Sequence, residues 1–232
     1  LLNDILDYSK IEAKKLDLEI IEFDLRNAVE GVAYTIASRA EEKGLELAAL
    51  VPHDMPTDLL GDPGRLRQVL INLMGNAIKF TEKGEVVIRT KKIEETQSHV
   101  KIRFAIEDTG IGIKTDRLEA IFKRFTQADG STTRKFGGTG LGLAISQYLV
   151  EAMGGELSVE SEYGKGSSFG FTVEFEKQAP KKSEAQIKVT DLRGLNVLII
   201  DDNDTNRIIL KKMVEGFGAK SYAVSRGNTF AI

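Results

Sequence analysis

Residues 62–81 read DPGRLRQVLINLMGNAIKFT, a stretch that predicts one long amphipathic helix. Asp62 suits the N-cap position because its side chain can accept a hydrogen bond from a free backbone N–H of the first turn. Pro63 suits the first helical position, where a backbone N–H would have no partner in any case. The apolar residues recur every three or four positions as far as Phe80, so the helix is expected to end there.

A polar stripe runs along this predicted helix. Asn72 and Asn76 are four residues apart and therefore share one face, which Lys79 and Phe80 continue. Such a stripe can offer an oxygen ligand, an ammonium group for phosphate and an aromatic ring to a single ligand. Magnesium favours oxygen ligands and commonly bridges protein and nucleotide phosphates. On this pattern alone, a solvated helix face is the simpler explanation of the two asparagines.

The residues around this helix alternate between strand and helix patterns. Besides the helix at 62–80, helices are predicted over 25–40, capped by Asp24 and ended by Gly44, and over 116–122 and 140–153. Strands are predicted over 18–23, 45–51, 85–93, 100–107, 156–161 and 168–175. After a polar stretch, an apolar run at 195–200 predicts a buried parallel strand, followed by a helix over 204–216 and a strand near 221–224. The chain is therefore expected to be an α/β protein.

The stretch EDTGIGI at residues 107–113 follows a predicted strand. The Asp108 carboxylate could accept a proton from an exocyclic amino group, and Gly110 and Gly112 would let the backbone approach a flat ring. A hydrogen bond to a charged group contributes about 1.5–3 kcal/mol. A simple turn is the alternative interpretation, because Asp and Gly are common turn residues.

The stretch GGTGLGL at residues 137–143 leads into a predicted helix, where backbone N–H groups can bind phosphate. A dinucleotide-binding fold would need a hydrophobic strand directly before it, but residues 131–135 read STTRK. A P-loop is excluded because Gly-Lys-Ser and Gly-Lys-Thr are absent. The polar residues before the glycines follow Phe122 and Phe125, which could pin a surface loop.

In this order, the motifs resemble those of the sensor histidine kinases. Residues 65–81 are similar to that family's N box, 107–113 to its first glycine box, 121–129 to its F box and 137–143 to its second glycine box. The resemblance implies a two-layer α+β sandwich of the Bergerat type, in which a mixed sheet packs on three helices. It also implies that ATP binds between helices beneath a mobile lid.

The resemblance further implies ATP and Mg²⁺ as cofactors and assigns residues to them. Asn76 is expected to bind magnesium, Lys79 the phosphates, and Phe80 and Asp108 the adenine side, beneath a lid at 126–138. The full ATP-binding set implied in this way is Asn72, Asn76, Lys79, Phe80, Asp108, Gly110, Gly112, Ile113, Phe125, Thr126, Gly138, Thr139, Gly140, Leu141 and Gly142.

The ends of the chain resemble other parts of a hybrid kinase. Asp201 and Asp202 match the magnesium carboxylates at the start of a receiver domain. The expected organisation is the end of a dimerisation helix at 1–18, the ATP-binding catalytic domain at 19–177, a linker at 178–193 and a truncated receiver at 194–232. The implied partners are the dimerisation and phosphotransfer domain of the same protein, a receiver domain or response regulator, and a second copy in a homodimer.

The amino-acid composition limits the partners and the chemistry that can be expected of the chain. With 41% hydrophobic and 29% charged residues the chain can bury an ordinary core, and its net charge of −3 gives no reason to expect a nucleic-acid partner. No cysteine is present, which excludes disulfides, thiolate zinc sites and cysteine nucleophiles. The expected location is the cytoplasm, in a parent protein that upstream segments could anchor to a membrane.

No catalytic residue is expected within the chain itself. His53 and His99 lack the family's surroundings for a phosphoacceptor histidine, which is expected upstream of Leu1. One alternative is an ATPase of the wider GHKL superfamily, but those enzymes place a glutamate where Asn72 stands, to activate water. A second is a non-catalytic nucleotide-sensing module, against which the intact glycines and Asp108 argue.

Overall fold

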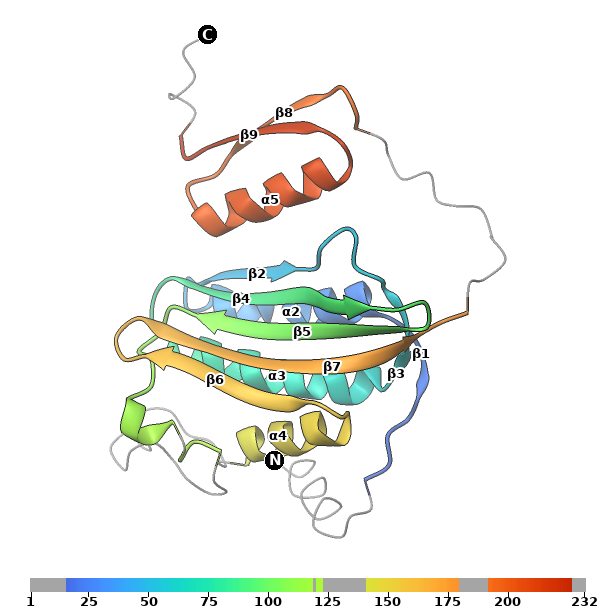
Figure 1. Cartoon of the computed structure of the whole chain (residues 1–232). Helices are drawn as coiled ribbons and strands as arrows, with labels where there is room; N and C mark the ends of the chain where they lie inside the picture. Colours follow the sequence, from blue (N-terminus) through green and yellow to red (C-terminus); the bar gives the residue numbers. More distant parts are fainter. Residues whose placement is uncertain (1–15, 119, 123–140, 180–191, 227–232) are drawn as a thin grey trace. The chain divides into compact units, whose positions relative to one another are not determined.

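The computed structural model describes residues 16–118, 120–122, 141–179 and 192–226 (Figure 1). The chain divides into two compact units. The first comprises Leu1–Ala49 with Pro56–Gln178, and the second comprises Leu50–Met55 with Ala179–Ile232. Most of the predicted opening helix, all of the predicted lid and most of the predicted linker lie outside the described residues.

The first unit contains a seven-stranded sheet with the strand order β1-β3-β7-β5-β4-β2, and β6 also pairs with β7. The pairings of β1 with β3 and of β7 with β3, β5 and β6 are antiparallel, as is that of β4 with β5. Figure 1 shows β2 and β4 running in the same direction, so the sheet is mixed, as predicted. Its strands are β1 (Ile21–Asp24), β2 (Glu46–Leu50), β3 (Asp58–Gly61), β4 (Glu85–Glu95), β5 (His99–Asp108), β6 (Glu156–Glu162) and β7 (Gly166–Lys177).

The described residues of this unit form three α-helices: α2 (Leu25–Glu41), α3 (Pro63–Phe80) and α4 (Gly142–Ala152). The predicted N-caps are confirmed, because Asp24 accepts a hydrogen bond from the backbone N–H of Asn27 and Asp62 accepts one from that of Arg65. The helix α3 contacts both α2 and α4 and packs on β4 and β5. It therefore lies at the centre of the helical layer.

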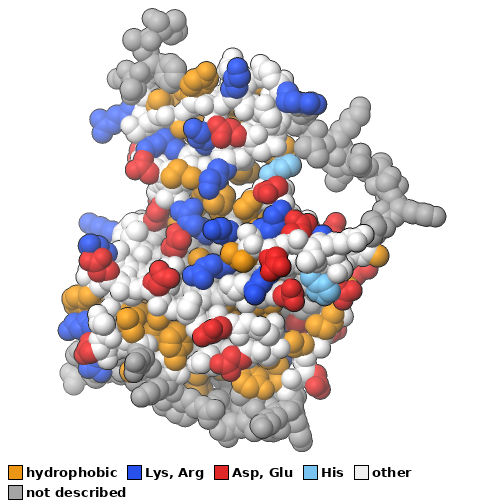
Figure 2. Space-filling view, viewed as in Figure 1, with side chains coloured by type: hydrophobic (Ala, Val, Ile, Leu, Met, Phe, Trp, Pro, Cys, Tyr) orange, Lys and Arg blue, Asp and Glu red, His pale blue; other side chains and the backbone are white. Residues whose placement is uncertain are grey.

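The sheet buries one face and exposes the other. On β5 the side chains of Val100, Ile102, Phe104 and Ile106 are buried, and Phe104 stacks on Phe171 of β7 with ring centroids 4.8 Å apart. Of the side chains that alternate with them, Lys101 and Arg103 are charged, and Figure 2 shows acidic and basic groups interspersed over the face in view. An antiparallel sheet with one core face and one solvated face has this alternation. The predicted two-layer sandwich is confirmed.

One strand was not predicted, and one predicted helix was wrong. The strand β3 was not predicted, because its four residues follow a loop with two prolines and show no long alternation. It forms by pairing with β1 along its whole length and with the end of β7. The helix predicted over 116–122 is, in the described part of that segment, only the 3-10 helix η1 (Thr115–Arg117).

The second unit contains the parallel strands β8 (Asn196–Ile200) and β9 (Lys220–Val224), with α5 (Asp204–Gly216) between them. Asn203 caps α5 by accepting a hydrogen bond of 3.0 Å from the backbone N–H of Asn206. This is the predicted strand–helix–strand order. Among the described helices of the whole chain, none is both long and apolar enough to cross a membrane.

Candidate nucleotide-binding site

Asp108 is the last residue of β5, and its carboxylate is partly buried. The backbone N–H of Gly110 donates a hydrogen bond of 2.9 Å to its Oδ1 atom. The backbone N–H and the hydroxyl of Ser167 also donate to this carboxylate. Burial raises the pKa of Asp108 above its ordinary value of 3.8, and the hydrogen bonds from Gly110 and Ser167 oppose that shift. The strand ends therefore hold a desolvated acceptor in a fixed orientation.

Two serines that lie outside the sequence motifs support this carboxylate. Ser167 pairs with Asp108 in the β5–β7 register. Its hydroxyl lies 3.1 Å from that of Ser161 on β6, and the Ser161 hydroxyl accepts a hydrogen bond of 2.8 Å from the backbone N–H of Ile113. This network joins the loop after β5 to two other strands. Only the pairing of distant strands reveals it, so no local sequence pattern points to these serines.

The glycines of the loop after β5 permit close backbone packing. A Cβ atom at Gly110 would come within 3.0 Å of the carbonyl oxygen of Phe80 on α3. Gly112 has a φ of +65°, and a Cβ atom there would come within 3.0 Å of the backbone of Glu162. From the sequence, these glycines are expected to let the backbone approach a flat ring. In the structure the nearest described neighbours are other segments of the protein backbone.

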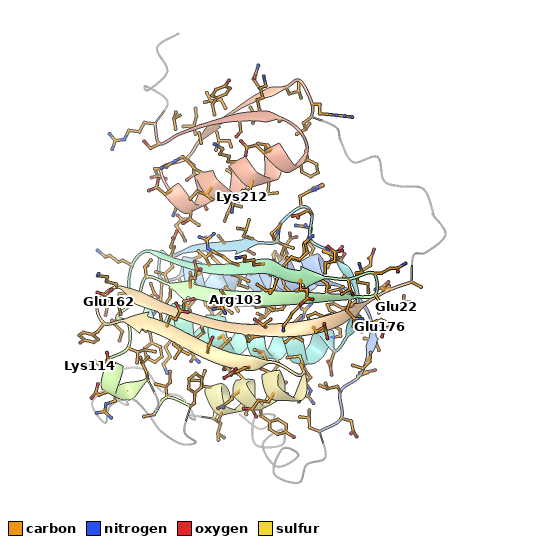
Figure 3. All side chains as sticks on the ribbon, viewed as in Figure 1. Glu22, Arg103, Lys114, Glu162, Glu176 and Lys212 are labelled. Atoms are coloured by element: carbon orange, nitrogen blue, oxygen red, sulfur yellow. The ribbon has the colours of Figure 1, made fainter. Side chains whose placement is uncertain are left out.

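The same loop contacts the turn between β6 and β7. The backbone N–H of Gly164 donates a hydrogen bond of 2.8 Å to the carbonyl oxygen of Ile111. The ammonium group of Lys114 lies 5.2 Å from the centre of the Tyr163 ring. Figure 3 shows Lys114 and Glu162 at the same end of the sheet. The loop is thus held between this turn and the end of α3.

The last turn of α3 brings two predicted site residues to this loop. The backbone N–H of Ile111 donates a hydrogen bond of 3.3 Å to the carbonyl oxygen of Phe80. The ammonium of Lys79 lies 4.9 Å from the centre of the Phe80 ring, and partial burial lowers the pKa of Lys79. One turn earlier, the half-buried side chain of Asn76 forms no hydrogen bond with any residue that the structure describes. An ammonium, an aromatic ring and an open amide therefore lie along one stripe.

Asn72 lies farther along this stripe and is engaged with α4. Its Nδ2 atom donates to the carbonyl oxygen of Gly142 and, over 2.8 Å, to the hydroxyl of Ser146. Ser146 is buried and was not singled out by the sequence analysis. Leu141, directly before α4, is also buried. The end of the second glycine box is thereby fastened to α3, while the predicted site residues Phe125, Thr126, Gly138, Thr139 and Gly140 lie outside the described residues.

Asp201 and Asp202 form the acidic pair of the second unit, and Asp201 accepts local hydrogen bonds. Asp201 accepts hydrogen bonds from the backbone N–H of Asn203 at 2.8 Å and from the side chain of Asn206 at 3.5 Å. Within the described ranges, no group of three or more His, Cys, Asp and Glu side chains is placed to hold a metal ion. The assignment of magnesium to Asp201 and Asp202 stays a prediction.

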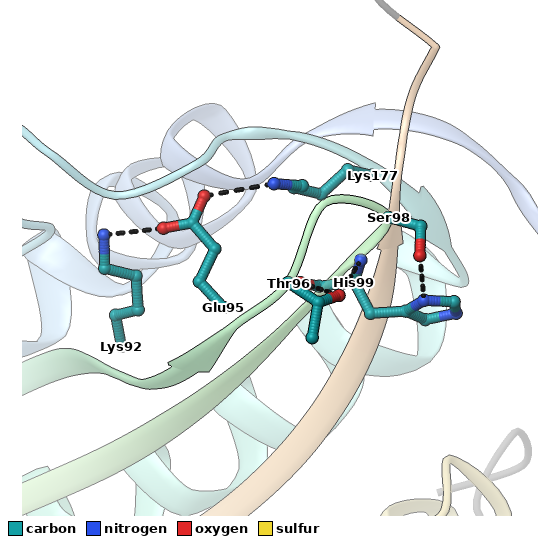
Figure 4. Close-up of polar contacts among 6 residues, drawn as sticks. All are labelled: Lys92, Glu95, Thr96, Ser98, His99 and Lys177. Atoms are coloured by element: carbon teal, nitrogen blue, oxygen red, sulfur yellow. Dashed lines mark hydrogen bonds and ion pairs between the residues drawn. The ribbon is translucent and has the colours of Figure 1, made fainter.

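His99 lies at the opposite end of β5 from Asp108. Nine residues of strand, at about 3.4 Å each, separate the two by roughly 30 Å. The ring Nδ1 atom of His99 is 2.9 Å from the Ser98 hydroxyl (Figure 4). Glu95 lies in the same β4–β5 hairpin, and hydrogen bonds from Lys92 and from Lys177 of β7 lower its pKa. His99 is therefore far from the candidate site.

Comparison with known proteins agrees with this fold. Residues 61–179, more than half of the chain, match the family described as histidine kinase-, DNA gyrase B-, and HSP90-like ATPases. The chain belongs to this family, and its first unit contains the ATP-binding catalytic domain of the histidine kinase type.

Among curated proteins, the chain is 43% identical to the sensor protein GacS of Pseudomonas syringae over 95% of its own length and 24% of that protein. It is 46% identical to the signal transduction histidine-protein kinase BarA of Escherichia coli, over 75% of this chain and 19% of BarA. The chain therefore spans at most about a quarter of these two relatives.

Among solved structures, full-length ShkA in complex with AMPPNP superposes with a TM-score of 0.82 at 36% identity. The match covers 98% of this chain and 45% of ShkA.

Proposed function

We propose that the chain is the ATP-binding catalytic part of a hybrid sensor histidine kinase. The parent protein would transfer the γ-phosphoryl group of ATP to a histidine outside this chain and then to a receiver aspartate. The observation that carries the proposal is the meeting of the Asp108 loop with the last turn of α3, through the hydrogen bond from Ile111 to Phe80. This backbone contact supports the proposal because it joins the loop that begins at Asp108 to the helical turn that contains Lys79 and Phe80.

Asp108 would recognise adenine. Its carboxylate already accepts hydrogen bonds from Gly110 and Ser167, and a carboxylate has roughly four lone-pair sites in all. The remaining acceptor capacity suits the exocyclic amino group of adenine, whereas guanine presents a carbonyl oxygen at the equivalent position of its ring. The Ser167 hydroxyl lies on the same carboxylate and would keep it oriented. ATP should therefore bind in preference to GTP.

Lys79 and Asn76 would hold the phosphates and their magnesium ion. The described residues contain no carboxylate and histidine cluster suited to a metal, so a cation here would depend on the nucleotide phosphates for most of its ligands. The Asn76 amide has no hydrogen-bond partner among the described residues, and its oxygen is the type of ligand that magnesium favours. The residues present therefore fit a magnesium–nucleotide complex.

Asn72 argues against the alternative of a hydrolytic ATPase. A neutral amide cannot take a proton from water, and its N–H donors face Gly142 and Ser146. The phosphoryl acceptor would instead come from the dimerisation and phosphotransfer domain of the parent protein. The parent is proposed to be a cytoplasmic or membrane-anchored homodimer whose catalytic domain draws on cytoplasmic ATP and serves a receiver domain or a response regulator.

Equilibrium titration and transfer in trans test this function together. The chain is titrated with ATP and with GTP in the presence of magnesium, and a separately produced dimerisation domain with its histidine is then added with γ-labelled ATP. We expect ATP to bind more tightly than GTP and label to reach the added histidine. A chain that binds neither nucleotide, or equal affinity for both, would contradict the proposal.

A further inference from the structure

Lys43, in the turn that follows α2, reaches the far end of α3. Its Nζ atom donates hydrogen bonds to the carbonyl oxygens of Ile78 at 2.7 Å, Lys79 at 2.9 Å and Thr81 at 3.1 Å. An ammonium group has three N–H donors and no acceptor. Each donor therefore has one carbonyl partner, and the three partners converge on a single point.

The Lys43 ammonium stabilises the C-terminal end of α3. The last carbonyl groups of an α-helix have no partner within the helix, and they form the negative end of its dipole. Lys43 supplies both the missing donors and a positive charge. Its backbone is held in place by the turn that ends α2, in which Gly44 has a φ of +65° and the buried Leu45 donates its N–H to the carbonyl oxygen of Ala40.

The segment that Lys43 holds is also the segment that meets the nucleotide loop. The carbonyl of Phe80, which Lys43 leaves free, accepts the hydrogen bond from Ile111. The hydroxyl of Thr81 turns back to the carbonyl oxygen of Ala77 at 2.8 Å. Every carbonyl from Ile78 to Thr81 thus has a donor, three from Lys43 and one from the loop after β5.

We propose that Lys43 is a positioning residue for the nucleotide site, acting through the last turn of α3. It keeps the side chains of Lys79 and Phe80 oriented without touching the nucleotide, and this role rests on the function proposed above. Removing the ammonium would leave three converging carbonyl dipoles that repel one another. The last turn would then fray, and the apparent affinity for ATP would fall in proportion to the fraction of molecules that remain ordered.

The first test compares Lys43→Ala and Lys43→Met with the matched control Lys101→Met, an exposed lysine on β5. We expect both Lys43 variants to bind ATP about threefold to tenfold more weakly than the parent chain and the control to bind like the parent. Hydrogen exchange should quicken at the amides of Thr81 and Ile111 in the Lys43 variants alone, because these two groups report the order of the last turn. If Lys43→Ala does not fold, Lys43→Met keeps the methylene stem and remains informative.

Chemical rescue separates positioning from a general loss of stability. Ammonium chloride should recover most of the lost ATP affinity of Lys43→Ala, because a free ammonium ion can donate to the same three carbonyls. Tetramethylammonium chloride at equal ionic strength should recover none, because it has no N–H donor. A folded Lys43→Ala variant that retains the parent's affinity and exchange rates would overturn the proposal, as would equal effects of the two salts. If the parent chain binds no ATP, the proposed function fails, whereas unchanged exchange at Thr81 in the variants would refute the role of Lys43 itself.

Discussion

The amide of Asn72 on α3 donates a hydrogen bond of 2.8 Å to the hydroxyl of Ser146 on α4. The same nitrogen also donates to the carbonyl oxygen of Gly142. These contacts fasten the start of α4 to the helix that carries Lys79 and Phe80. Both contacts require a hydrogen-bond donor at position 72. An ionised carboxylate at this position has no proton to donate, so it would lie against the carbonyl oxygen without forming a hydrogen bond.

The first prediction concerns Asn72→Glu. Adding a possible general base should not by itself create an ATPase, because the substitution removes the donor to Gly142 and Ser146. We expect the variant to lose about 1–3 kcal/mol of unfolding free energy, the range for leaving polar groups without partners. Urea unfolding measures this loss, and Ser146→Ala, which keeps the bond to Gly142, should lose less. Undiminished stability together with rapid phosphate release would refute this interpretation of Asn72.

The second prediction concerns Asp108→Asn. Replacing one carboxylate oxygen by an amino group removes the charge and part of the acceptor capacity, so ATP affinity should fall about tenfold, or ~1.4 kcal/mol. The matched control is Glu107→Gln, because Glu107 is the neighbouring acid on β5 and forms an ion pair of 2.7 Å with Arg89. The Glu107 side chain points to the opposite face of the sheet from Asp108. The Glu107→Gln variant should therefore bind ATP with the affinity of the parent chain. Equal losses in the two variants would exclude a specific role for Asp108.

The third prediction concerns pH. Burial raises the pKa of Asp108 above 3.8, so the folded protein holds this proton more tightly than the unfolded chain. The contribution of Asp108 to stability is therefore fully present below pH 3.8 and is lost as the pH rises through the raised pKa. ATP binding should show the reverse trend and weaken as the pH falls through that same raised pKa. Calorimetric titration of the parent and Asp108→Asn across this range should show the step in the parent alone.

The fourth prediction compares two glycines. Gly112→Ala should lose about 1–3 kcal/mol of unfolding free energy, because its φ of +65° disfavours a side chain and the new Cβ would meet the backbone of Glu162. Gly75→Ala, inside α3, meets no described atom within 4 Å and should gain up to about 1 kcal/mol from helix propensity. Urea unfolding of both variants checks the two signs. A Gly112→Ala variant as stable as the parent would contradict the described packing of this loop.

The helical layer could be predicted well from the sequence because its signals are local. Asp24 and Asp62 cap α2 and α3 as expected, and Gly44 ends the turn after α2 with a positive φ. The strand β3 could not be predicted, because its four residues are strand-like only through their pairing with β1. Short segments that depend on distant partners carry little periodic signal.

The residues of the candidate site also fall into two groups, those that local motifs reveal and those that only distant contacts reveal. Lys79, Phe80 and Asp108 could be singled out from their motifs, since each motif is continuous in the sequence. Ser167 and Lys43 could not, because their contacts with Asp108 and with the end of α3 join segments far apart in the chain. Their roles depend on strand register and on the path of a turn, which a single sequence does not encode locally.

The central claim is that this chain binds ATP for transfer to a histidine elsewhere and does not itself consume it. Incubating the chain with γ-labelled ATP and magnesium, and then analysing bound nucleotide, released phosphate and protein-bound label, tests this most directly. We predict ATP that is bound and intact, because Asn72 cannot serve as a base and no acceptor histidine lies in the described site. Rapid phosphate release, or stable label on His53 or His99, would contradict the account.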